Sequence, residues 1–351
     1  MVRRPSPEAA KLYASYVPVR ITDMRGVDLN VWTFDWDLTF AAMAMGADGT
    51  VLHRFGSRDA RPPEHWLTAA SWQQFLEAGL RSHRAARGGD PPRAPEAPAL
   101  TIEGIPAFAE RDRGECIHCH SARPALRIEA QKRGDWNRDM LWVYPPPSTV
   151  GIDLDRNNQA LVTEVAPGSP AAKAGLRAGD RLANFATATD FMAWLDGLSA
   201  EGAKEPLEIV PAGEAKSRNV ELELPAGWKA YGAKEFAWRP SKWGLSPAPG
   251  FGGPVLDAPA LAKLGLSEDA FAFEVDYLVT WGENQRWGKA AAAAGVRDGM
   301  IVLGTEEKRD FLSIDHFHAW WRLQVEPGST VRLAIWKHGE LTFIRLPVGK
   351  R

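Results

Sequence analysis

The chain has 351 residues, of which 45% are hydrophobic and 25% are charged, and its formal net charge is −2. This composition is typical of a folded chain of two or three domains, and the near-neutral charge argues against a nucleic-acid partner. The longest nearly apolar run, Lys289 to Gly295, is far shorter than the roughly 20 residues that cross a bilayer, so no membrane span is predicted.

The first 90 residues predict a small α/β unit. Ser6 is placed to cap a helix, with Pro7 in its first turn. Alternating or periodic apolar residues then indicate the other elements. The expected elements in chain order are a helix at 6–16, a strand at 16–21, a hairpin with strands at 40–45 and 51–55, and an amphipathic helix at 71–85.

This order of elements resembles a thioredoxin-like domain that lacks its first strand and its active-site turn. The phrases at 24–29 (MRGVDL) and 34–40 (FDWDLTF) are similar to those of a bacterial family of thioredoxin-like, PDZ-containing proteins, some of whose members are selenoproteins. The family carries a redox C-x-x-C, or a selenocysteine variant, at the start of the helix that corresponds here to 1–16. The resemblance therefore implies an active-site motif upstream of Met1. The family's cis-proline is missing, because Asp37-Leu38 precedes Thr39.

Residues 91–147 are predicted to be a linker followed by a short Cys/His segment. The stretch at 84–98 is rich in proline and glycine and predicts neither helix nor strand. The motif Cys116-Ile117-His118-Cys119-His120 contains the only two cysteines of the chain. Three chemistries use such a motif: covalent attachment of a c-type haem, a redox dithiol, or part of a metal site. A structural pair without chemistry is the further alternative.

The haem interpretation uses all three fixed residues of the motif. The thiols of Cys116 and Cys119 would add to the haem vinyl groups, and His120 would become the proximal iron ligand. Met140 is the nearest sixth ligand in the sequence, with ordinary packing as its alternative role. A metal site would use His120 or His118. Haem of this type is attached outside the cytoplasm, whereas residues 1–16 carry no export signal. A periplasmic or otherwise exported protein is expected if the native start lies upstream.

Residues 148–227 resemble a PDZ domain, through the phrase at 169–182 (SPAAKAGLRAGDRL). Ser169 can cap a short helix, Pro170 fits its first turn and Gly175 can end it. The PDZ family binds peptide or protein C-termini by adding a strand to a sheet edge. The resemblance implies a peptide site whose carboxylate loop, pairing strand and helical wall use Val150, Gly151, Ile152, Asp153 and Asp190. A PDZ fold used only for packing is the alternative.

Residues 228–351 are predicted to form a second, divergent PDZ-like domain. The segment 291–303 repeats the pattern of 171–183. In this repeat Gly295 corresponds to Gly175 and Gly299 corresponds to Gly179. The expected Gly-apolar-Gly-apolar loop is not recognisable, and 282–289 looks like an insertion. The two histidines at 316 and 318 fall on a predicted helix, where side chains two residues apart diverge.

The sequence therefore predicts an α+β multidomain fold: a partial thioredoxin-like domain, a Cys/His segment and two PDZ-like domains. The leading function is redox or electron transfer, with haem c as cofactor and PDZ modules for peptide or protein partners. One alternative is a non-enzymatic PDZ scaffold. The other is a thiol or seleno oxidoreductase whose active site lies upstream of Met1, because residues 1–90 contain no thiol. The sequence contains no G-x-S-x-G nucleophile context, so a protease is not predicted.

Overall fold

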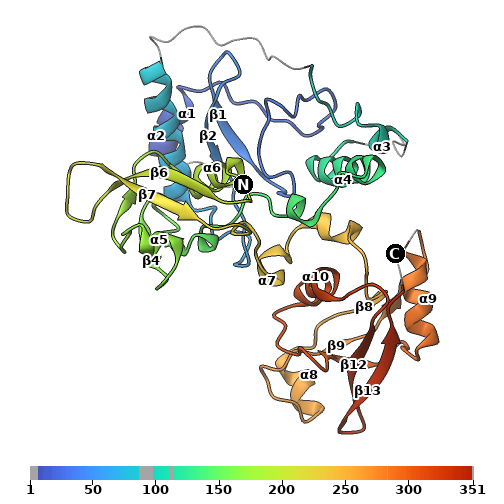
Figure 1. The fold of residues 1–351 in the computed structure, drawn as a ribbon. Helices are drawn as coiled ribbons and strands as arrows, with labels where there is room; N and C mark the ends of the chain where they lie inside the picture. Colours follow the sequence, from blue (N-terminus) through green and yellow to red (C-terminus); the bar gives the residue numbers. More distant parts are fainter. Residues whose placement is uncertain (1–6, 87–97, 111–113, 115, 283, 350–351) are drawn as a thin grey trace. The chain divides into compact units, whose positions relative to one another are not determined.

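The computed structural model describes the chain except for residues 1–6, 87–97, 111–113, 115, 283 and 350–351 (Figure 1). The chain divides into two compact units, Met1–Tyr231 and Gly232–Arg351. Each unit has a hydrophobic core of its own.

The first unit begins with a helix and a β-hairpin backed by a long helix. Strands β1 (Ala42–Met45) and β2 (Val51–Phe55) pair antiparallel, and α2 (Ala69–Ala86) packs against them, as does α1 (Pro7–Tyr13) against α2 (Figure 1). The predicted hairpin and amphipathic helix are confirmed. Ser6, the predicted cap, lies outside the described residues.

The predicted strand at 16–21 is wrong. This segment has no regular secondary structure. Val17 and Val19 are 89% and 75% exposed, so the alternation of apolar residues does not correspond to a buried sheet face here.

The Cys/His segment is helical and surrounds a small core. Its elements are α3 (Pro106–Ala109), the 3-10 helix η1 (Cys119–Ser121), α4 (Ala122–Arg133) and the 3-10 helix η2 (Arg138–Leu141). Ile117 and Ala122 pack there against Met24, Leu29 and Phe34 from the start of the chain. The sequence did not predict α4, whose helix ends at Gly134 with φ +80°.

The rest of the first unit is built from two small antiparallel sheets and two helices. Strand β3 pairs with β4, and the other sheet has the order β5-β6-β7. The elements are η3 (Pro147–Thr149), β3 (Ile152–Leu154), β4 (Val162–Val165), α5 (Pro170–Lys173), β5 (Arg181–Leu182), α6 (Ala188–Gly197), β6 (Ala203–Val210) and β7 (Arg218–Leu224).

Local sequence accounts for the two helices of this part. The Ser169 hydroxyl accepts from the Ala172 amide at 3.1 Å, and Pro170 follows it in the first turn of α5. Gly175 then takes φ +83°. Thr187 caps α6 by accepting from the Asp190 amide at 3.0 Å. The capping predicted from the phrase at 169–182 is confirmed.

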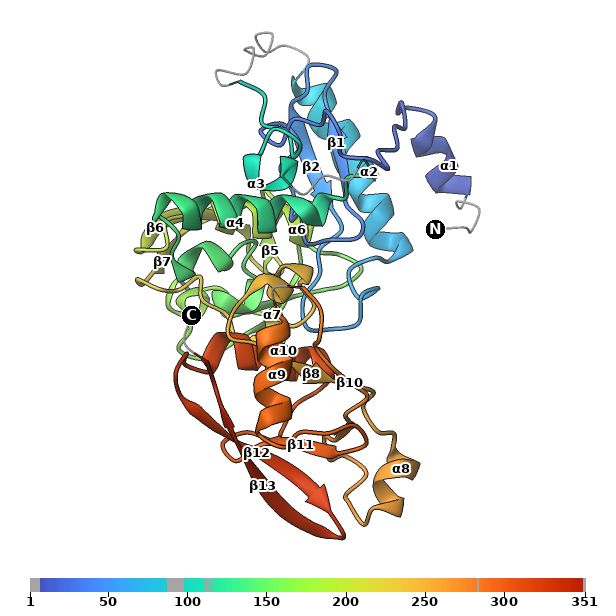
Figure 2. The ribbon, with the colours of Figure 1, turned by 90° about the vertical axis from the view of Figure 1, so that its right-hand side faces the viewer.

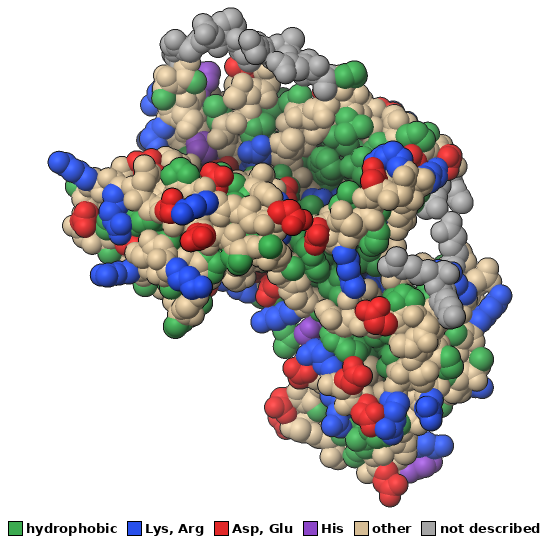
Figure 3. Space-filling view, in the orientation of Figure 1, with side chains coloured by type: hydrophobic (Ala, Val, Ile, Leu, Met, Phe, Trp, Pro, Cys, Tyr) green, Lys and Arg blue, Asp and Glu red, His purple; other side chains and the backbone are tan. Residues whose placement is uncertain are grey.

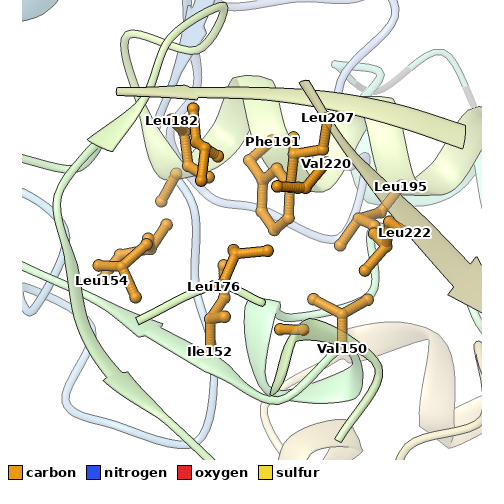
Figure 4. Close-up of a cluster of buried hydrophobic side chains, with 14 of the residues drawn as sticks. Val150, Ile152, Leu154, Leu176, Leu182, Phe191, Leu195, Leu207, Val220 and Leu222 are labelled. Carbon is orange, nitrogen blue, oxygen red and sulfur yellow. The ribbon is translucent and has the colours of Figure 1, made fainter. Parts of the chain in front are cut away.

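The core of this part lies between β3, α6 and the β5-β6-β7 sheet. Figure 4 shows side chains from all three converging, including Ile152, Phe191, Leu207 and Leu222. Burial alternates along β7, where Val220, Leu222 and Leu224 point inward, because successive side chains of a strand face opposite sides.

The second unit combines a four-stranded sheet of order β13-β12-β11-β9, a two-stranded sheet of β8 and β10, and several helices. Figure 2 shows the long β12–β13 hairpin. The elements are α7 (Ala233–Phe236), the 3-10 helix η4 (Pro240–Gly244), β8 (Phe251–Gly252), α8 (Ala258–Lys263), β9 (Phe273–Glu274), β10 (Tyr277–Leu278), α9 (Gln285–Ala293), β11 (Ile301–Thr305), α10 (Ile314–Gln324), β12 (Thr330–Lys337) and β13 (Glu340–Pro347). The predicted helix around the two histidines is confirmed as α10.

The two units repeat one backbone hydrogen-bond pattern. In the first unit, the Gly179 amide donates to the Val162 carbonyl and the Val162 amide to the Asp180 carbonyl, both at 2.8 Å. The second unit makes the same pair of bonds at 2.8 Å between Gly299 and Val275 and between Val275 and Met300.

The repeat extends to a glycine that precedes the first strand of each pattern. The Ala166 amide donates to the Gly151 carbonyl, and the Val279 amide donates to the Gly250 carbonyl, each at 2.8 Å. Gly151 and Gly250 have φ values of +85° and +83°. Gly250-Phe251 is therefore the counterpart of Gly151-Ile152, which corrects the expectation that no such loop is recognisable in the second unit.

Two surface properties complete the description. Within the described ranges, no helix has both the length and the apolar character that crossing a bilayer requires. On the face shown in Figure 3, basic and acidic side chains are interspersed.

Candidate functional site

The candidate peptide site of the first unit lies between β3 and α6. Val150 and Ile152 belong to the same buried cluster as Phe191 and Leu195 of α6 (Figure 4). Their burial leaves little of these apolar side chains accessible to a ligand. Residues 53–66, from the N-terminal part of the chain, help to bury this region. We call them the covering segment.

The covering segment is bonded to the start of α6. The Asp190 carboxylate accepts from the His53 ring, Nδ1 to Oδ2 at 2.8 Å, and from the Arg54 amide, N to Oδ1 at 2.7 Å. Because a carboxylate only accepts, Nδ1 of His53 carries the proton. Nε2 of the same ring lies 2.8 Å from the Ser82 hydroxyl of α2.

Thr187, which caps α6, and Thr189 within it extend this attachment. The Thr187 hydroxyl donates to the Arg54 carbonyl at 2.5 Å. The Thr189 hydroxyl accepts from the Ser57 amide at 3.1 Å and lies 2.6 Å from the Ser57 hydroxyl. The Thr189 contacts are buried, which increases the cost of losing them.

The covering segment also reaches β3. The Arg61 guanidinium donates to both carboxylate oxygens of Asp153, at 2.9 and 3.0 Å, and to Asp59 at 2.6 Å. Burial alone would raise the pKa of Asp59, but the bonds and the charge of Arg61 outweigh it and hold that pKa below its usual value. Arg61 thus links the covering segment to the strand that the resemblance assigns to peptide pairing.

Trp66 ends the covering segment inside the core. It is 1% exposed and belongs to the hydrophobic cluster of Val150, Ile152 and Phe191. Its indole donates to Asp59 at 2.9 Å. The Trp66 carbonyl accepts from the side-chain Nε2 of Gln159 at 2.7 Å, and Oε1 of the same side chain accepts from the Ala188 backbone amide of α6 at 3.0 Å.

The structure therefore brings the candidate peptide-binding residues Val150, Gly151, Ile152, Asp153 and Asp190 into one module, and gives the two acids intramolecular partners. Sequence reasoning missed these partners, which are His53, Arg54 and Arg61, and it also missed the burial of Trp66 in the same core. No local signal could have revealed them, since the Trp66 to Gln159 bond spans 93 residues of the chain.

The two cysteines differ in their environment. Both are free thiols; Cys116 is exposed and Cys119 is half-buried. The Cys119 thiol donates to the Leu38 carbonyl at 3.1 Å. Burial raises the pKa of Cys119, although backbone amides at the start of η1 oppose this effect. Cys119 is therefore the less reactive thiol.

The two histidines of the motif are stacked. The rings of His118 and His120 are parallel within 3°, with centroids 5.3 Å apart. Burial and the neighbouring His118 lower the pKa of His120. Among the described residues, no group of three or more His, Cys, Asp or Glu side chains is arranged to hold a metal ion.

The surroundings of the motif fit a covalently held porphyrin poorly. The inner side of the motif is filled by protein, since Ile117 is 1% exposed and Cys119 packs against the same cluster. Met140, the nearest candidate sixth ligand in the sequence, is 47% exposed on η2. Haem attachment through Cys116, Cys119 and His120 stays a prediction from the sequence, and no chemistry is assigned through it.

The phrase at 34–40 lies against the Cys/His segment. Its Leu38 carbonyl accepts from Cys119. Its two acids flank Arg123 of α4, with Asp35 at 2.9 Å and Asp37 at 3.4 Å. This phrase thus forms part of the environment of the cysteine pair.

Comparison with known proteins gives a match to a protein family and a remote similarity to solved structures. Residues 161–183 match the PDZ domain family. No curated protein matches the sequence. The solved structure of an HtrA-type protease, AlgW with decapeptide, is 16% identical, with a TM-score of 0.24, over 41% of this chain and 42% of that chain. The match thus spans less than half of that protease. The family match covers β4, α5 and β5, and these residues carry the sequence signature of a PDZ domain.

Proposed function

We propose that this protein binds peptide or protein partners through the PDZ module of its first unit. The observation that carries the proposal is the match of residues 161–183 to the PDZ domain family. Strand β3 and helix α6 supply the two walls that such domains use. Among the described residues β3 pairs with β4 alone, so no other strand occupies the edge at which a peptide strand would add.

The covering segment competes with a ligand at this site. An incoming peptide would have to displace the Arg61 to Asp153 bonds and the contacts of Ser57 with Thr189. A ligand that binds only the uncovered state must first displace the covering segment. Its apparent affinity is therefore its intrinsic affinity multiplied by the fraction of uncovered molecules. The first unit is therefore proposed to bind weakly until the covering segment is released.

The test is selection of C-terminal peptides from a random library against the full chain, followed by hydrogen exchange with the selected peptide. The expected result is slower exchange at 151–155 and 188–195, and loss of binding when the peptide ends in a carboxamide. Failure to select any peptide, or protection confined to other regions, would contradict the proposal.

A matched pair of variants tests the role of the covering segment. Arg61→Ala removes the link to β3 and should tighten peptide binding by about tenfold or more, since several charged hydrogen bonds no longer hold the cover. Glu64→Ala, which changes an exposed side chain of the same segment, is the control. Equal affinities for both variants and the parent would show that the covering segment does not compete with the peptide.

A thiol redox role is the second candidate function. It is supported by the two free cysteines directly before α4 and by the resemblance of the first 90 residues to thioredoxin-like domains. Titration with glutathione, followed by mass spectrometry of the 116–119 peptide, tests it. A reversible disulfide between Cys116 and Cys119 would support the role, and a pair that never forms a disulfide would exclude it.

Haem attachment and export to the periplasm are tested together. The chain would be exported in cells that attach c-type haem, and its spectrum recorded in alkaline pyridine. A covalent haem band that disappears in Cys116→Ala and Cys119→Ala would support an electron-transfer protein. A colourless exported protein would exclude haem and leave the dithiol and scaffold functions.

A further inference from the structure

The second unit contains a cavity of about 380 Å³ that the proposed function does not use. Its walls are mainly aromatic and come from several elements. Two polar side chains of α10 also line it. The residues that matter for its chemistry are Trp243, Gly250, Tyr277, Trp281, His318 and Arg322.

Arg322 places a charge in this cavity, and no acid of the described residues neutralises it. It is 7% exposed. Its Nη1 lies 3.2 Å from His318 Nδ1 and donates to the His318 carbonyl at 3.3 Å, and its guanidinium lies 5.0 Å from the Trp243 ring centroid. Its Nε has no hydrogen-bond partner within the described part of the chain. No carboxylate among the described residues pairs with it, although a buried cation normally requires one.

His318 adds a second donor that faces no acceptor. Arginine can only donate, so Nδ1 of His318 must accept from Arg322 and the ring proton lies on Nε2. That Nε2 is buried and has no partner among the described residues. Burial, together with Arg322 and Lys242, lowers the pKa of His318 well below its usual value, which keeps the ring neutral.

The two α10 side chains at the cavity are thus one cation and one neutral donor. Burial lowers the pKa of Arg322 to about 10, so the guanidinium is charged at neutral pH. A single negative charge with two acceptor oxygens would satisfy both groups.

The aromatic walls define the remainder of the ligand. Trp243 and Trp281 are partly exposed at the cavity, and Tyr277 stands 6.0 Å from Trp281 by ring centroids. Such rings favour contact with a large apolar or aromatic group. The cavity volume is in the range of small-ligand sites.

We propose that this cavity binds a carboxylate attached to a large apolar or aromatic group, with Arg322 and His318 holding the carboxylate. The site uses residues of the second unit alone and does not depend on peptide binding by the first. Gly250, the counterpart of Gly151, directly precedes β8 and lines the cavity. A peptide C-terminus and a free aromatic acid both have the required chemistry.

Calorimetric titration of the full chain tests the site. The probes are N-acetylphenylalanine, its carboxamide, and a pentapeptide that ends in phenylalanine with a free carboxylate. We expect saturable binding of both acids, with the carboxamide weaker by at least about tenfold, because the carboxylate makes the charged bonds. A pentapeptide that binds more tightly than the small acid identifies a peptide terminus as the ligand, and the reverse identifies a free acid. Equal binding of acid and amide, or no binding of either acid at millimolar concentration, would overturn the proposal.

Variants locate the binding. Arg322→Gln should weaken binding of both acids by about tenfold or more, whereas Arg332→Gln, a surface change on β12, should leave it unchanged. Hydrogen exchange should slow at 250–252 and 314–324 and not at 151–155, which separates this site from the peptide site of the first unit. If Arg322→Gln does not fold, hydrogen exchange of the unmodified chain with each acid still decides the matter, because protection at 151–155 without protection at 250–252 and 314–324 would overturn the proposal.

Discussion

The imidazole of His53 and the carboxylate of Asp190 lie 2.8 Å apart, although 137 residues separate them in the chain. The same carboxylate also accepts from the Arg54 amide at 2.7 Å. This arrangement fixes the β1–β2 hairpin to the first turn of α6, so the N-terminal part and the PDZ module share one set of buried bonds.

Removing this carboxylate should destabilise the first unit. Asp190→Ala leaves the His53 ring and the Arg54 amide without their acceptor, and we expect the free energy of unfolding to fall by about 1–3 kcal/mol. Denaturant unfolding measures the change. Glu201→Ala, an exposed acid of the same unit, should change stability by less than about 0.5 kcal/mol. Similar losses for the two variants would show that the Asp190 bonds carry no special weight.

The two cysteines should react at different rates. Cys116 is exposed, whereas the Cys119 thiol is half-buried, donates to Leu38 and has a raised pKa. We expect iodoacetamide at neutral pH to modify Cys116 at least about tenfold faster. Mass spectrometry of the labelled peptides measures the two rates, and Cys116→Ser and Cys119→Ser give each rate alone. Faster labelling of Cys119 would contradict the described packing of the motif.

The two counterpart glycines should tolerate alanine poorly. At Gly151 a Cβ would stand 2.1 Å from the Cβ of Ser169, and at Gly250 it would stand 2.2 Å from the Trp287 backbone. Gly175 has a similar positive φ but open space around it. Gly175→Ala should therefore cost about 1–2 kcal/mol from its backbone conformation alone, and the other two substitutions should cost more. Thermal unfolding checks the order, and equal costs would contradict it.

The second unit should lose stability in mild acid. The pKa of His318 is lowered well below its usual value by burial, Arg322 and Lys242, and burial also lowers that of His316. Below about pH 6.5 the unfolded chain binds protons that the folded chain does not, so the free energy of unfolding falls as the pH falls. The slope approaches about 1.4 kcal/mol per pH unit for each such group.

Hydrogen exchange of α10 at several pH values measures this slope for the second unit. His318→Gln removes one titrating group while its amide oxygen can still accept from Arg322, so the slope should become shallower. An unchanged slope in this variant would show that His318 does not contribute to the acid sensitivity.

Local features of the fold could be predicted from the sequence, and long-range ones could not. The helix cap at Ser169 and the turn at Gly175 depend only on neighbouring residues in the chain, so the local sequence predicts both. Gly250-Phe251 was overlooked because α8 and its connections separate it from the segment that it pairs with. The strand expected at 16–21 failed because alternation of apolar residues does not show whether a partner strand exists.

The candidate site shows the same division. The resemblance to a whole PDZ domain was enough to predict that five residues belong to one site: Val150, Gly151, Ile152, Asp153 and Asp190. The contacts of Arg61 and Trp66 with that domain follow from tertiary packing alone. Periodicity cannot indicate that a tryptophan completes the core of a module encoded much later in the chain.

The position of Trp66 in this core has a consequence for how the first unit folds. Because ribosomes make the chain from its N-terminus, the covering segment is synthesised well before Gln159 and α6, and its indole has no hydrophobic core to enter until they appear. Contacts of such high sequence separation form slowly, since a long loop must close first. A fragment containing residues 148–227 alone would lack this indole and leave its place open to solvent, so we expect the first unit to fold cooperatively only when both parts belong to one chain.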